Sequence, residues 1–570
     1  MKYTGARIVI ECLVEQGVDT VFGYPGGAIL NIYDELYKHK DRIRHILTAH
    51  EQGAAHAADG YSRSTGKTGV VLATSGPGAT NLVTGIATAY MDSVPMVAIT
   101  CNVGCSLLGK DSFQEVDITG ITMPITKHNY IVRDVNRLAE TICEAFLIAQ
   151  SGRPGPVLID IPKDVTAAVA DYEPLVVGFA SEKPDSISRR NVRRVIKEKF
   201  PTDQDFENAT QLINSSVRPF LYIGGGVIIS DACTELKEFA EKRNIPVAVS
   251  LMGKSAFPSE HELCCGMIGM HGTKAANCGA NKSDLIIAVG ARFSDRVISD
   301  SSKFAKSSKV LHIDIDPAEI NKNIPTAASL VGDIKSILAK IIPMIESRSS
   351  SEWNEQITEW KQHIPAMYSK KTKLHPKFVF EYINRKLGDD TIITTEVGQH
   401  QMWTAQFYPF SKPRTFLTSG GLGTMGYGTG AAIGAQVANP NRKVVHIAGD
   451  GSFRMNCNEL ATIAHYNLPI IIIVVNNGVL GMVRQWQNLF YDKRYSETTL
   501  DFGPDFVKLA EAYGIQGYRA LSEEEFIGVF DLAVKGGKPA VIDCGMNIDE
   551  MVLPMVPAGK PIDQLLLDIE

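Results

Sequence analysis

Length, composition and charge exclude several classes of protein. The chain has 570 residues, of which 44% are hydrophobic and 21% charged, and its formal net charge is −6. This is the composition of a globular protein with roughly three or four domains, and the negative charge argues against nucleic-acid binding. The N-terminus lacks a signal-peptide pattern, no apolar run is long enough to span a bilayer, and the ten cysteines lack paired zinc spacing. We therefore expect a cytoplasmic protein that binds neither nucleic acid nor a membrane.

Short β-branched runs alternate with helix-length amphipathic stretches along the whole chain. This alternation is typical of α/β proteins with parallel sheets. We predict three doubly wound parallel-sheet domains at residues 1–165, 209–345 and 375–570. Representative predicted strands are VVLATSG and PVLIDIP in the first block, LIIAVGARFSD and VLHIDIDP in the second, and KVVHIAGDG and PIIIIVVNN in the third.

Two stretches of poor periodicity separate the blocks. The charged stretch from about Thr166 to Asn208 predicts a connection, and its basic run SRRNVRRVIKEKF predicts a solvated helix face or an exposed insert. The polar segment ESRSSSEWNEQITEW predicts a linker before the third block.

Three turns of the first block contain candidate site residues. FGYPGGAIL contains Gly26 and Gly27, whose backbone N–H groups are suited to binding a reacting oxyanion. LTAHEQGAAHAADGYSRSTG contains Glu51 before a small-residue helix, and ATSGPGATN contains Pro77 in a Gly/Pro turn. Taken alone, Glu51 is equally well explained as a glutamate that stabilises a helix N-terminus through the helix dipole.

Two predicted strands of the third block end in the segments GDG and NN. Because ligands bind where neighbouring parallel strands end, Asp450 and Asn477 are expected to lie together. Carboxylate and amide oxygens suit Mg²⁺, particularly where it also binds phosphates, and Gly449 and Gly451 let the backbone approach a diphosphate. Either segment alone is an ordinary strand end, whereas the combination is much more specific.

This combination resembles the thiamine-diphosphate-binding motif. The resemblance gives Glu51 a chemical role, because thiamine chemistry needs a carboxylate that shares a proton with the pyrimidine ring. GLGTMG matches a dinucleotide-binding pattern, but no ribose-binding acid follows at the right distance, and the resemblance instead places Met425 beneath the cofactor. The implied Mg²⁺ ligands are Asp450, Asn477 and the carbonyl of Val479, and the implied cofactor contacts include Gly26, Pro77, Gly449, Gly451 and Ser452.

A closer resemblance covers nearly the whole chain. GYPGGAIL, FQEVDITGITMPITKHNY, RPGPVLIDIPKDV, GMIGMHGT, GARFSDRV, GGLGTMGYG and GMVRQWQNLFY occur in this order from about residue 5 to 550. They resemble the catalytic subunit of the acetohydroxyacid (acetolactate) synthases. The resemblance implies an enzyme that decarboxylates pyruvate on thiamine diphosphate. It then joins the two-carbon unit to pyruvate or 2-oxobutyrate, as in branched-chain amino-acid synthesis.

The same resemblance assigns residues to the reaction cleft. Arg296 would bind the carboxylate of the second substrate, for which a guanidinium is suited, and Trp486 and Met482 would line the pocket for its side chain. Without these motifs, a surface salt bridge for Arg296 and a core position for Trp486 would be the simpler interpretations. The remaining cleft residues that the resemblance implies are Gly27, Glu51, Phe113, Gln114 and Lys163.

The middle block resembles a domain that binds FAD as a structural cofactor. Two departures from the family pattern occur: Ser294 stands where an acid is common, which weakens one flavin contact, and Thr429-Gly430 stands where Leu-Pro is usual, which is expected to loosen a helix start. The implied flavin-binding residues are Arg153, Gly224, Gly225, Gly226, Ser250, Leu251, Met252, Met270, His271, Gly290, Arg292, Ser294, Asp314 and Asp333, with Arg296 and Met482 also counted as cofactor contacts.

Three alternatives remain open at this point. A flavin-dependent pyruvate oxidase would share both cofactors, and a carboligase for another aldehyde or keto acid would share the mechanism. A non-catalytic paralogue would be expected to lack Glu51, Asp450 or Asn477, all of which are present. Glu51 and the metal motif lie in different blocks, and the resemblance implies an active site assembled across a dimer interface, so we expect a homodimer or homotetramer. Whether a small regulatory subunit binds is left open.

Overall fold

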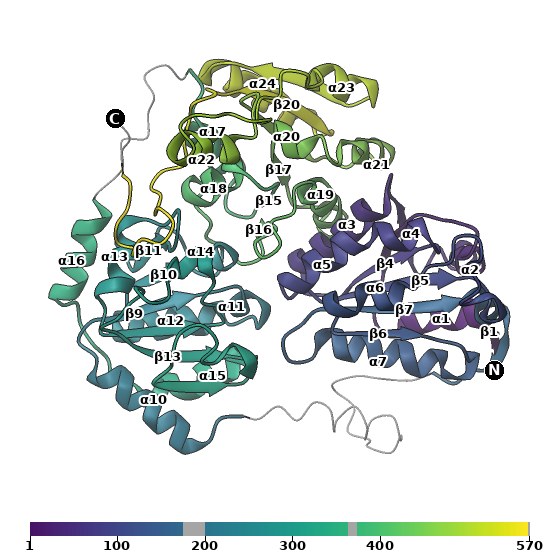
Figure 1. Ribbon diagram of the computed structural model, residues 1–570, viewed down its shortest axis with the longest axis horizontal. Helices are drawn as coiled ribbons and strands as arrows, with labels where there is room; N and C mark the ends of the chain where they lie inside the picture. The colour runs from purple at the N-terminus through teal and green to yellow at the C-terminus, as the bar shows by residue number, and fades with distance from the viewer. Residues whose placement is uncertain (175–199, 363–372, 568–570) are drawn as a thin grey trace.

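Three six-stranded parallel sheets follow one another along the chain (Figure 1). The computed structural model describes residues 1–174, 200–362 and 373–567. The predicted α/β class with three parallel sheets is confirmed. We refer to each sheet with its helices as the N-terminal, middle and C-terminal unit. Within the described residues, no helix is long and apolar enough to cross a membrane, and the ten cysteines form no disulfide.

The N-terminal unit has the strand order β3-β2-β4-β5-β7-β6. Its central strand β5 is buried at every residue, as expected for a parallel sheet covered by helices. The strands are β2 Thr20–Gly23, β3 Arg44–Leu47, β4 Gly69–Ala73, β5 Met96–Asn102, β6 His128–Ile131 and β7 Pro156–Pro162, and the helices are α1 Gly5–Glu15, α2 Leu30–Lys38, α3 Glu51–Thr65, α4 Pro77–Asn81, α5 Val83–Met91, α6 Ile118–Thr122, α7 Leu138–Gln150 and α8 Lys163–Ala167.

The middle unit has the strand order β11-β10-β9-β12-β13-β14. Its central strands β9 and β12 are wholly buried. The strands are β9 Pro219–Ile223, β10 Val247–Val249, β11 Cys264–Met267, β12 Leu285–Val289, β13 Lys309–Asp314 and β14 Ala328–Val331, and the helices are α10 Asp203–Ser215, α11 Gly226–Ile229, α12 Cys233–Arg243, α13 Lys274–Lys282, α14 Asp295–Ile298, α15 Ile334–Ile341 and α16 Glu352–Lys361.

The C-terminal unit has the strand order β16-β15-β17-β18-β20-β19. In the register of β17 and β18, Gly449 lies opposite Val475, so Asp450 emerges at the same edge as Asn476, which ends β18, and Asn477, which follows it. The strands are β15 Ile392–Thr395, β16 Phe416–Leu417, β17 Val444–Gly449, β18 Ile471–Asn476, β19 Gln516–Ala520 and β20 Ala540–Gly545, and the helices are α17 Pro376–Leu387, α18 Gln399–Phe407, α19 Tyr427–Ala438, α20 Asp450–Phe453, α21 Leu460–His465, α22 Gly481–Phe490, α23 Phe506–Ala512 and α24 Glu523–Gly536.

The predicted connections are more ordered than their composition indicates. The segment predicted as a linker before the third block contains helix α16, because Trp353 and Ile357, one helical turn apart, are buried against the middle unit. Strand β8 (Val169–Asp171) lies inside the first connection and pairs antiparallel with β1 (Lys2–Thr4). The basic run predicted as a solvated helix face or insert lies outside the described residues, apart from Phe200.

Helices α3 and α19 join the N-terminal unit to the C-terminal unit, and they lie side by side in Figure 1. Small residues allow the two helix backbones to approach closely: a Cβ on Gly434 would lie 1.8 Å from the carbonyl oxygen of Ala57. One hydrophobic cluster extends from the first sheet to the third across this contact, whereas the clusters of the middle unit include only Ala405 and Ile562 from the C-terminal part of the chain as buried members. The two units that carry the thiamine motif are therefore packed as one body.

Candidate functional site

The carboxyl edge of the N-terminal sheet places Glu51 at the start of α3. Its side chain is buried, and its Oε2 accepts a hydrogen bond from Asn81 Nδ2 at 2.9 Å. The other oxygen, Oε1, faces the first turn of α4, since a Cβ on Gly78 would lie 3.2 Å from it. A backbone with a glycine at this point leaves room for a ring or water to approach the carboxyl oxygen.

The remaining candidates of the N-terminal unit surround the same edge. Gly26 packs on Thr74, whose hydroxyl accepts a hydrogen bond from the N–H of Ala28 at 3.3 Å. A Cβ on Gly76 would lie 2.9 Å from Gln114 Cβ, so the turn that contains Pro77 adjoins Gln114. The members of this group that are exposed are Gly27, Pro77, Phe113, Gln114 and Lys163.

The carboxyl edge of the C-terminal sheet places the predicted metal ligands together. Asp450 is the first residue of α20, and burial raises the pKa of its carboxyl to about 6. Asn477 follows β18, where its Nδ2 donates to Gln399 Oε1 at 3.1 Å and its Oδ1 accepts from the N–H of Val479 at 3.3 Å. Within the described residues no cluster of three His, Cys, Asp or Glu side chains occurs, so a cation here would need amide and carbonyl oxygens beside Asp450.

A buried histidine beside this edge fits a bound anion. His400 lies on α18, and a Cβ on Gly449 would be 2.7 Å from its Nδ1. Its Nε2 is buried without a hydrogen-bond partner in the described part of the chain, and burial lowers its pKa to about 3, so the ring is neutral. Buried polar atoms are normally satisfied. With the proton of the neutral ring on Nε2, this atom could donate to a diphosphate oxygen at the strand end, and a divalent cation there would stabilise the charged form of Asp450.

The backbone directly after Met425 is fixed by hydrogen bonds to both the N–H and the carbonyl of Gly426. Glu396, fully buried after β15, accepts hydrogen bonds from the N–H groups of Gly426 at 2.6 Å and Gly428 at 3.0 Å. Asn456 donates to the carbonyl of Gly426 at 2.6 Å. Glu396 also accepts from the N–H of Thr429 at 3.3 Å, and the expectation that Thr429-Gly430 loosens this helix start stays a prediction.

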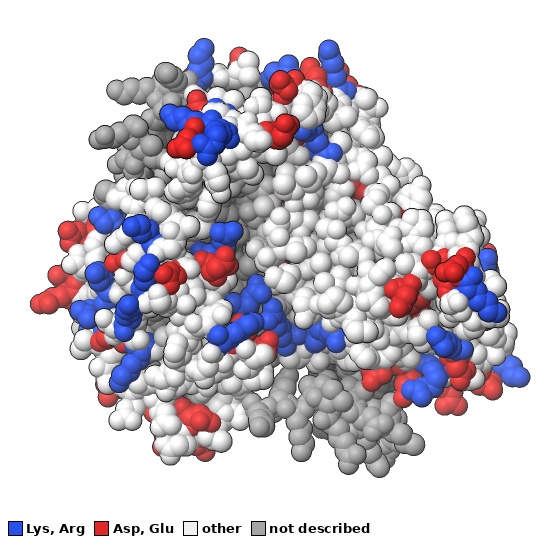
Figure 2. Space-filling model, viewed as in Figure 1, with Lys and Arg blue, Asp and Glu red and all other residues white. Residues whose placement is uncertain are grey.

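A cavity of about 1990 Å³ opens where the three units meet. It is larger than the usual 300–1,000 Å³ of a small-ligand pocket, and Lys and Arg side chains gather near the junction of the N-terminal and middle units (Figure 2). The structure brings all the predicted flavin residues together with the second-substrate residues on its wall: Arg153, Gly224, Gly225, Gly226, Ser250, Leu251, Met252, Met270, His271, Gly290, Arg292, Ser294, Arg296, Asp314, Asp333, Met425, Met482 and Trp486.

The other predicted site residues do not line this cavity. Neither Glu51 nor Asp450 lines it, and the remaining predicted residues of the two sheet edges are also absent from its wall. A Cβ on Gly451 would lie 4.0 Å from Met425 Cε, so the C-terminal edge adjoins the cavity through Met425. The candidate residues therefore form two groups in one chain: a cavity with the adjoining metal edge, and a separate edge with Glu51.

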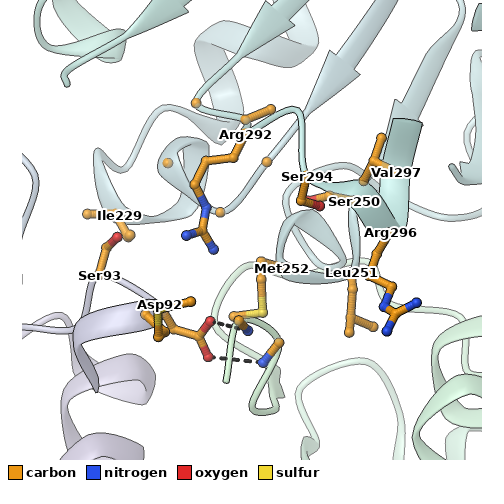
Figure 3. Close-up of a pocket in the computed structure, with 18 of the residues that line it drawn as sticks. Asp92, Ser93, Ile229, Ser250, Leu251, Met252, Arg292, Ser294, Arg296 and Val297 are labelled. Atoms are coloured by element: carbon orange, nitrogen blue, oxygen red, sulfur yellow. Dashed lines mark hydrogen bonds between the residues drawn. The ribbon is translucent and has the colours of Figure 1, made fainter. Parts of the chain in front are cut away.

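Two arginines of the middle unit are placed differently in the cavity (Figure 3). The side chain of Arg292 extends into it, whereas Arg296 lies beside Leu251 at its margin. Arg296 is exposed, and its only nearby acid among the described residues is Asp295, at 3.8 Å. A guanidinium so weakly paired is available to a carboxylate ligand.

Asp92 joins the N-terminal unit to the loop before Met425. Its two carboxylate oxygens accept hydrogen bonds from consecutive N–H groups, Gly421 at 2.7 Å and Gly420 at 3.0 Å (Figure 3). The same carboxylate is paired with Arg63 at 3.0 Å. A Cβ on Gly420 would lie 2.3 Å from Met252 Sδ, so all three units meet at this point.

Two other predicted flavin residues already have protein partners. Arg153 is paired with Glu319 at 2.9 Å and with Asp316 at 3.3 Å. His271 is buried with its Nδ1 3.3 Å from the carbonyl of Pro554, and burial lowers its pKa to about 4. A ligand in the cavity would therefore meet a neutral His271 and an Arg153 that is already compensated.

Several residues of the two edges were missed by sequence reasoning. Asn81 is the last residue of the segment ATSGPGATN, which was already a candidate, so its contact with Glu51 could have been inferred. His400 follows the end of β15, and β15 neighbours β17 in the sheet, so its position near Asp450 could also have been inferred. Asp92 and Glu396 gave no signal, because their partners are backbone N–H groups distant in the sequence.

Comparisons with known proteins agree with this geometry. Three family models match: the N-terminal TPP binding domain, the central domain and the C-terminal TPP binding domain of thiamine pyrophosphate enzymes, at residues 3–121, 206–341 and 396–544. The acetolactate synthase large subunit of Pyropia yezoensis is 47% identical over 99% of this chain and 95% of its own length. The large subunit of Corynebacterium glutamicum is 47% identical over 98% of this chain and 89% of its own.

A third relative, the probable acetolactate synthase large subunit of Methanocaldococcus jannaschii, is 47% identical over 99% of this chain and 95% of its own length. The chain therefore belongs to the thiamine pyrophosphate enzymes, and within them to the acetolactate synthases. The sequence-based expectation of a thiamine-dependent enzyme of this family is confirmed.

Proposed function

We propose that the enzyme decarboxylates pyruvate and transfers the two-carbon unit to a second 2-keto acid. With pyruvate as acceptor the product is 2-acetolactate, and with 2-oxobutyrate it is 2-aceto-2-hydroxybutyrate. The observation that carries this proposal is the cavity wall, where Arg296, Trp486 and Met425 line one space. This wall offers a carboxylate-binding cation and an aromatic side chain beside the loop predicted to lie under the cofactor.

We assign Mg²⁺ to the C-terminal sheet edge and FAD to the cavity. Asp450, Asn477 and the carbonyl of Val479 would hold the cation, supported by the burial of the Asp450 carboxyl at this edge. FAD is supported by a cavity of about 1990 Å³, and Arg292, which extends into it (Figure 3), would contact the flavin diphosphate.

The chain's own groups have separate tasks in this reaction. Thiamine diphosphate, when bound, supplies the electron sink for decarboxylation. Glu51 holds or releases a proton at Oε1 while Asn81 fixes Oε2, Arg296 binds the acceptor carboxylate, and Trp486 limits the acceptor side chain and excludes water. Excluding water matters because protonation would release an aldehyde instead of the ligated product.

A second copy of the chain would complete the site. Figure 2 shows a broad face without charged side chains over α5 and α6. Exposed apolar residues of this part of the chain include Tyr90, Ile121 and Met123. Because Glu51 lies outside the cavity that Met425 lines, a homodimer that joins the Glu51 edge of one copy to the metal edge of the other fits both observations. The relatives named large subunits also support a small regulatory partner.

A product assay of the wild type and Glu51→Gln tests the proposal. With thiamine diphosphate, Mg²⁺ and FAD, and equal concentrations of pyruvate and 2-oxobutyrate, the wild type should form both acetohydroxy acids. Glu51→Gln should lose at least about 100-fold in rate while it keeps its thermal melting temperature. Formation of acetate with consumption of oxygen would instead indicate a pyruvate oxidase, and a normal rate in Glu51→Gln would overturn the role of Glu51.

A further inference from the structure

Glu459, in the C-terminal unit, accepts hydrogen bonds from the backbone of the N-terminal unit just before Glu51. It lies between α20 and α21, and its side chain is fully buried. Its Oε1 accepts a hydrogen bond from the N–H of His50 at 3.0 Å, and its Oε2 accepts from the N–H of Ala49 at 3.1 Å. Thr462 Oγ1 donates to the same Oε2 at 2.7 Å, which fixes the carboxylate from its own side.

These contacts determine where α3 begins. The first N–H groups of a helix have no partner within the helix and need one from outside, and a negative charge is favourable there. The imidazole of His50 accepts from the N–H of Gln52 at 3.0 Å, so it caps the helix from within the chain. Glu459 holds the two preceding N–H groups, and together they fix the backbone on the N-terminal side of Glu51.

The first turn of α3 is shaped around this carboxylate. A Cβ on Gly53 would lie only 2.0 Å from Glu459 Oε1, so a glycine at this position is required for the carboxylate to approach. The backbone from Ala49 to Gly53 therefore wraps around a buried acid from another unit. Loss of the acid would leave two N–H groups without an acceptor and a gap beneath the turn.

We propose that Glu459 is a positioning residue for Glu51: it holds the turn before α3 so that the Glu51 carboxylate stays on Asn81 and directs its other oxygen to the cofactor. The inference rests on the proposed role of Glu51. Glu459 and Asp450 belong to one short segment, nine residues apart. That segment would thus bind the cation at one end and fix the catalytic carboxylate of its own chain at the other.

Glu459→Gln tests the inference with almost no change in volume. The two N–H groups are bonded to different oxygens of Glu459, so the amide oxygen replaces only one acceptor, while the amide NH₂ faces the other N–H donor. Asp284→Asn is a matched control, because Asp284 also accepts two consecutive N–H groups, those of Val217 at 2.9 Å and Arg218 at 3.0 Å, and the hydroxyl of Ser216. Asp284 precedes β12, at the end of the middle sheet remote from the cavity-lining Gly290.

Two measurements separate positioning from general instability. In protein without cofactors, hydrogen–deuterium exchange should accelerate at the backbone amides of residues 49–52 in Glu459→Gln, and at residues 217–218 in Asp284→Asn. In loaded enzyme, exchange of the thiamine diphosphate C2 proton and product formation should both fall by roughly 10- to 100-fold in Glu459→Gln. The concentration of thiamine diphosphate for half-saturation should stay within about twofold, and Asp284→Asn should keep wild-type rates.

The outcomes distinguish this inference from the proposed function. If Glu51→Gln is inactive but Glu459→Gln exchanges the C2 proton at the wild-type rate, Glu459 does not position Glu51 and the inference fails alone. If Glu51→Gln itself keeps a normal rate, the proposed function of Glu51 fails first. Equal losses in Glu459→Gln and Asp284→Asn would assign both effects to stability and would also overturn the inference.

Discussion

Buried carboxylates that accept backbone N–H groups recur at the contacts between units. Asp92, from the N-terminal unit, holds Gly420 and Gly421 of the C-terminal unit, while Glu459, from the C-terminal unit, holds Ala49 and His50 of the N-terminal unit. A carboxylate can accept two parallel N–H donors, and such charge-assisted bonds are stronger than neutral ones. Each acid therefore fixes a backbone segment next to a residue with a proposed role in the reaction.

Asp92→Asn should loosen the loop at the cavity. The amide would replace one acceptor oxygen by a donor that faces an N–H group or Arg63, which costs about 1–3 kcal/mol. Because Gly420 packs on Met252 in the cavity wall, we expect a lower melting temperature together with weaker FAD binding, measured as flavin retained after dialysis. Asp284→Asn is again the control, and unchanged flavin retention in Asp92→Asn would contradict the argument.

The positions of both halves of the thiamine motif depend on the contact between helices α3 and α19. Glu51 opens α3, and α19 begins two residues after Met425. The helices approach so closely that several crossing positions admit only glycine: a Cβ on Gly60 would lie 2.2 Å from the carbonyl of Ala431. Main-chain contacts of this kind cannot be relieved by a side-chain rotation.

Gly434→Ala should force the two helices apart. Its Cβ would lie 1.8 Å from the carbonyl oxygen of Ala57, so overpacking should cost at least about 1–3 kcal/mol. Gly528→Ala in α24 is the matched control, because that glycine is also inside a helix but has no atom within 4 Å of its Cβ position. The control should gain about 0.5–1 kcal/mol from helix propensity. Thermal unfolding of both variants gives the comparison, and equal melting temperatures would refute the argument.

At the scale of the whole molecule, the residues of one reaction lie in two separate places. The cavity contains the groups proposed for FAD and the second substrate, and Glu51 lies at another edge. The uncharged face over α5 and α6 (Figure 2) is the surface that we propose for a second copy, which would bring the two together.

Met123→Lys should weaken this assembly. Met123 is 66% exposed next to α6, and an ammonium buried in an apolar interface without a partner is unfavourable. We expect a shift toward monomer in sedimentation velocity and a specific activity that rises with protein concentration. Leu532→Lys is the control, since Leu532 is 57% exposed on α24. A monomeric wild-type enzyme with full activity would rule out the shared site.

The sequence by itself determined the class of fold and the two motif edges. Buried β-branched strands leave a strong local signal, and residues that follow neighbouring parallel strands must emerge at one edge, which placed Asp450 beside Asn477. The segment before the third block was predicted as a linker because its polar residues masked the helical spacing of Trp353 and Ile357.

Only the tertiary structure decided which groups hold these edges in place. Glu459 and its N–H partners are 409 and 410 residues apart, and Asp92 and its partners are 328 and 329 apart. Every residue except proline carries a backbone N–H. The sequence of a segment therefore does not show whether its N–H groups donate to a distant carboxylate. The distribution of candidate residues between one cavity and a separate edge likewise depends on how the three units pack, which local periodicity does not determine.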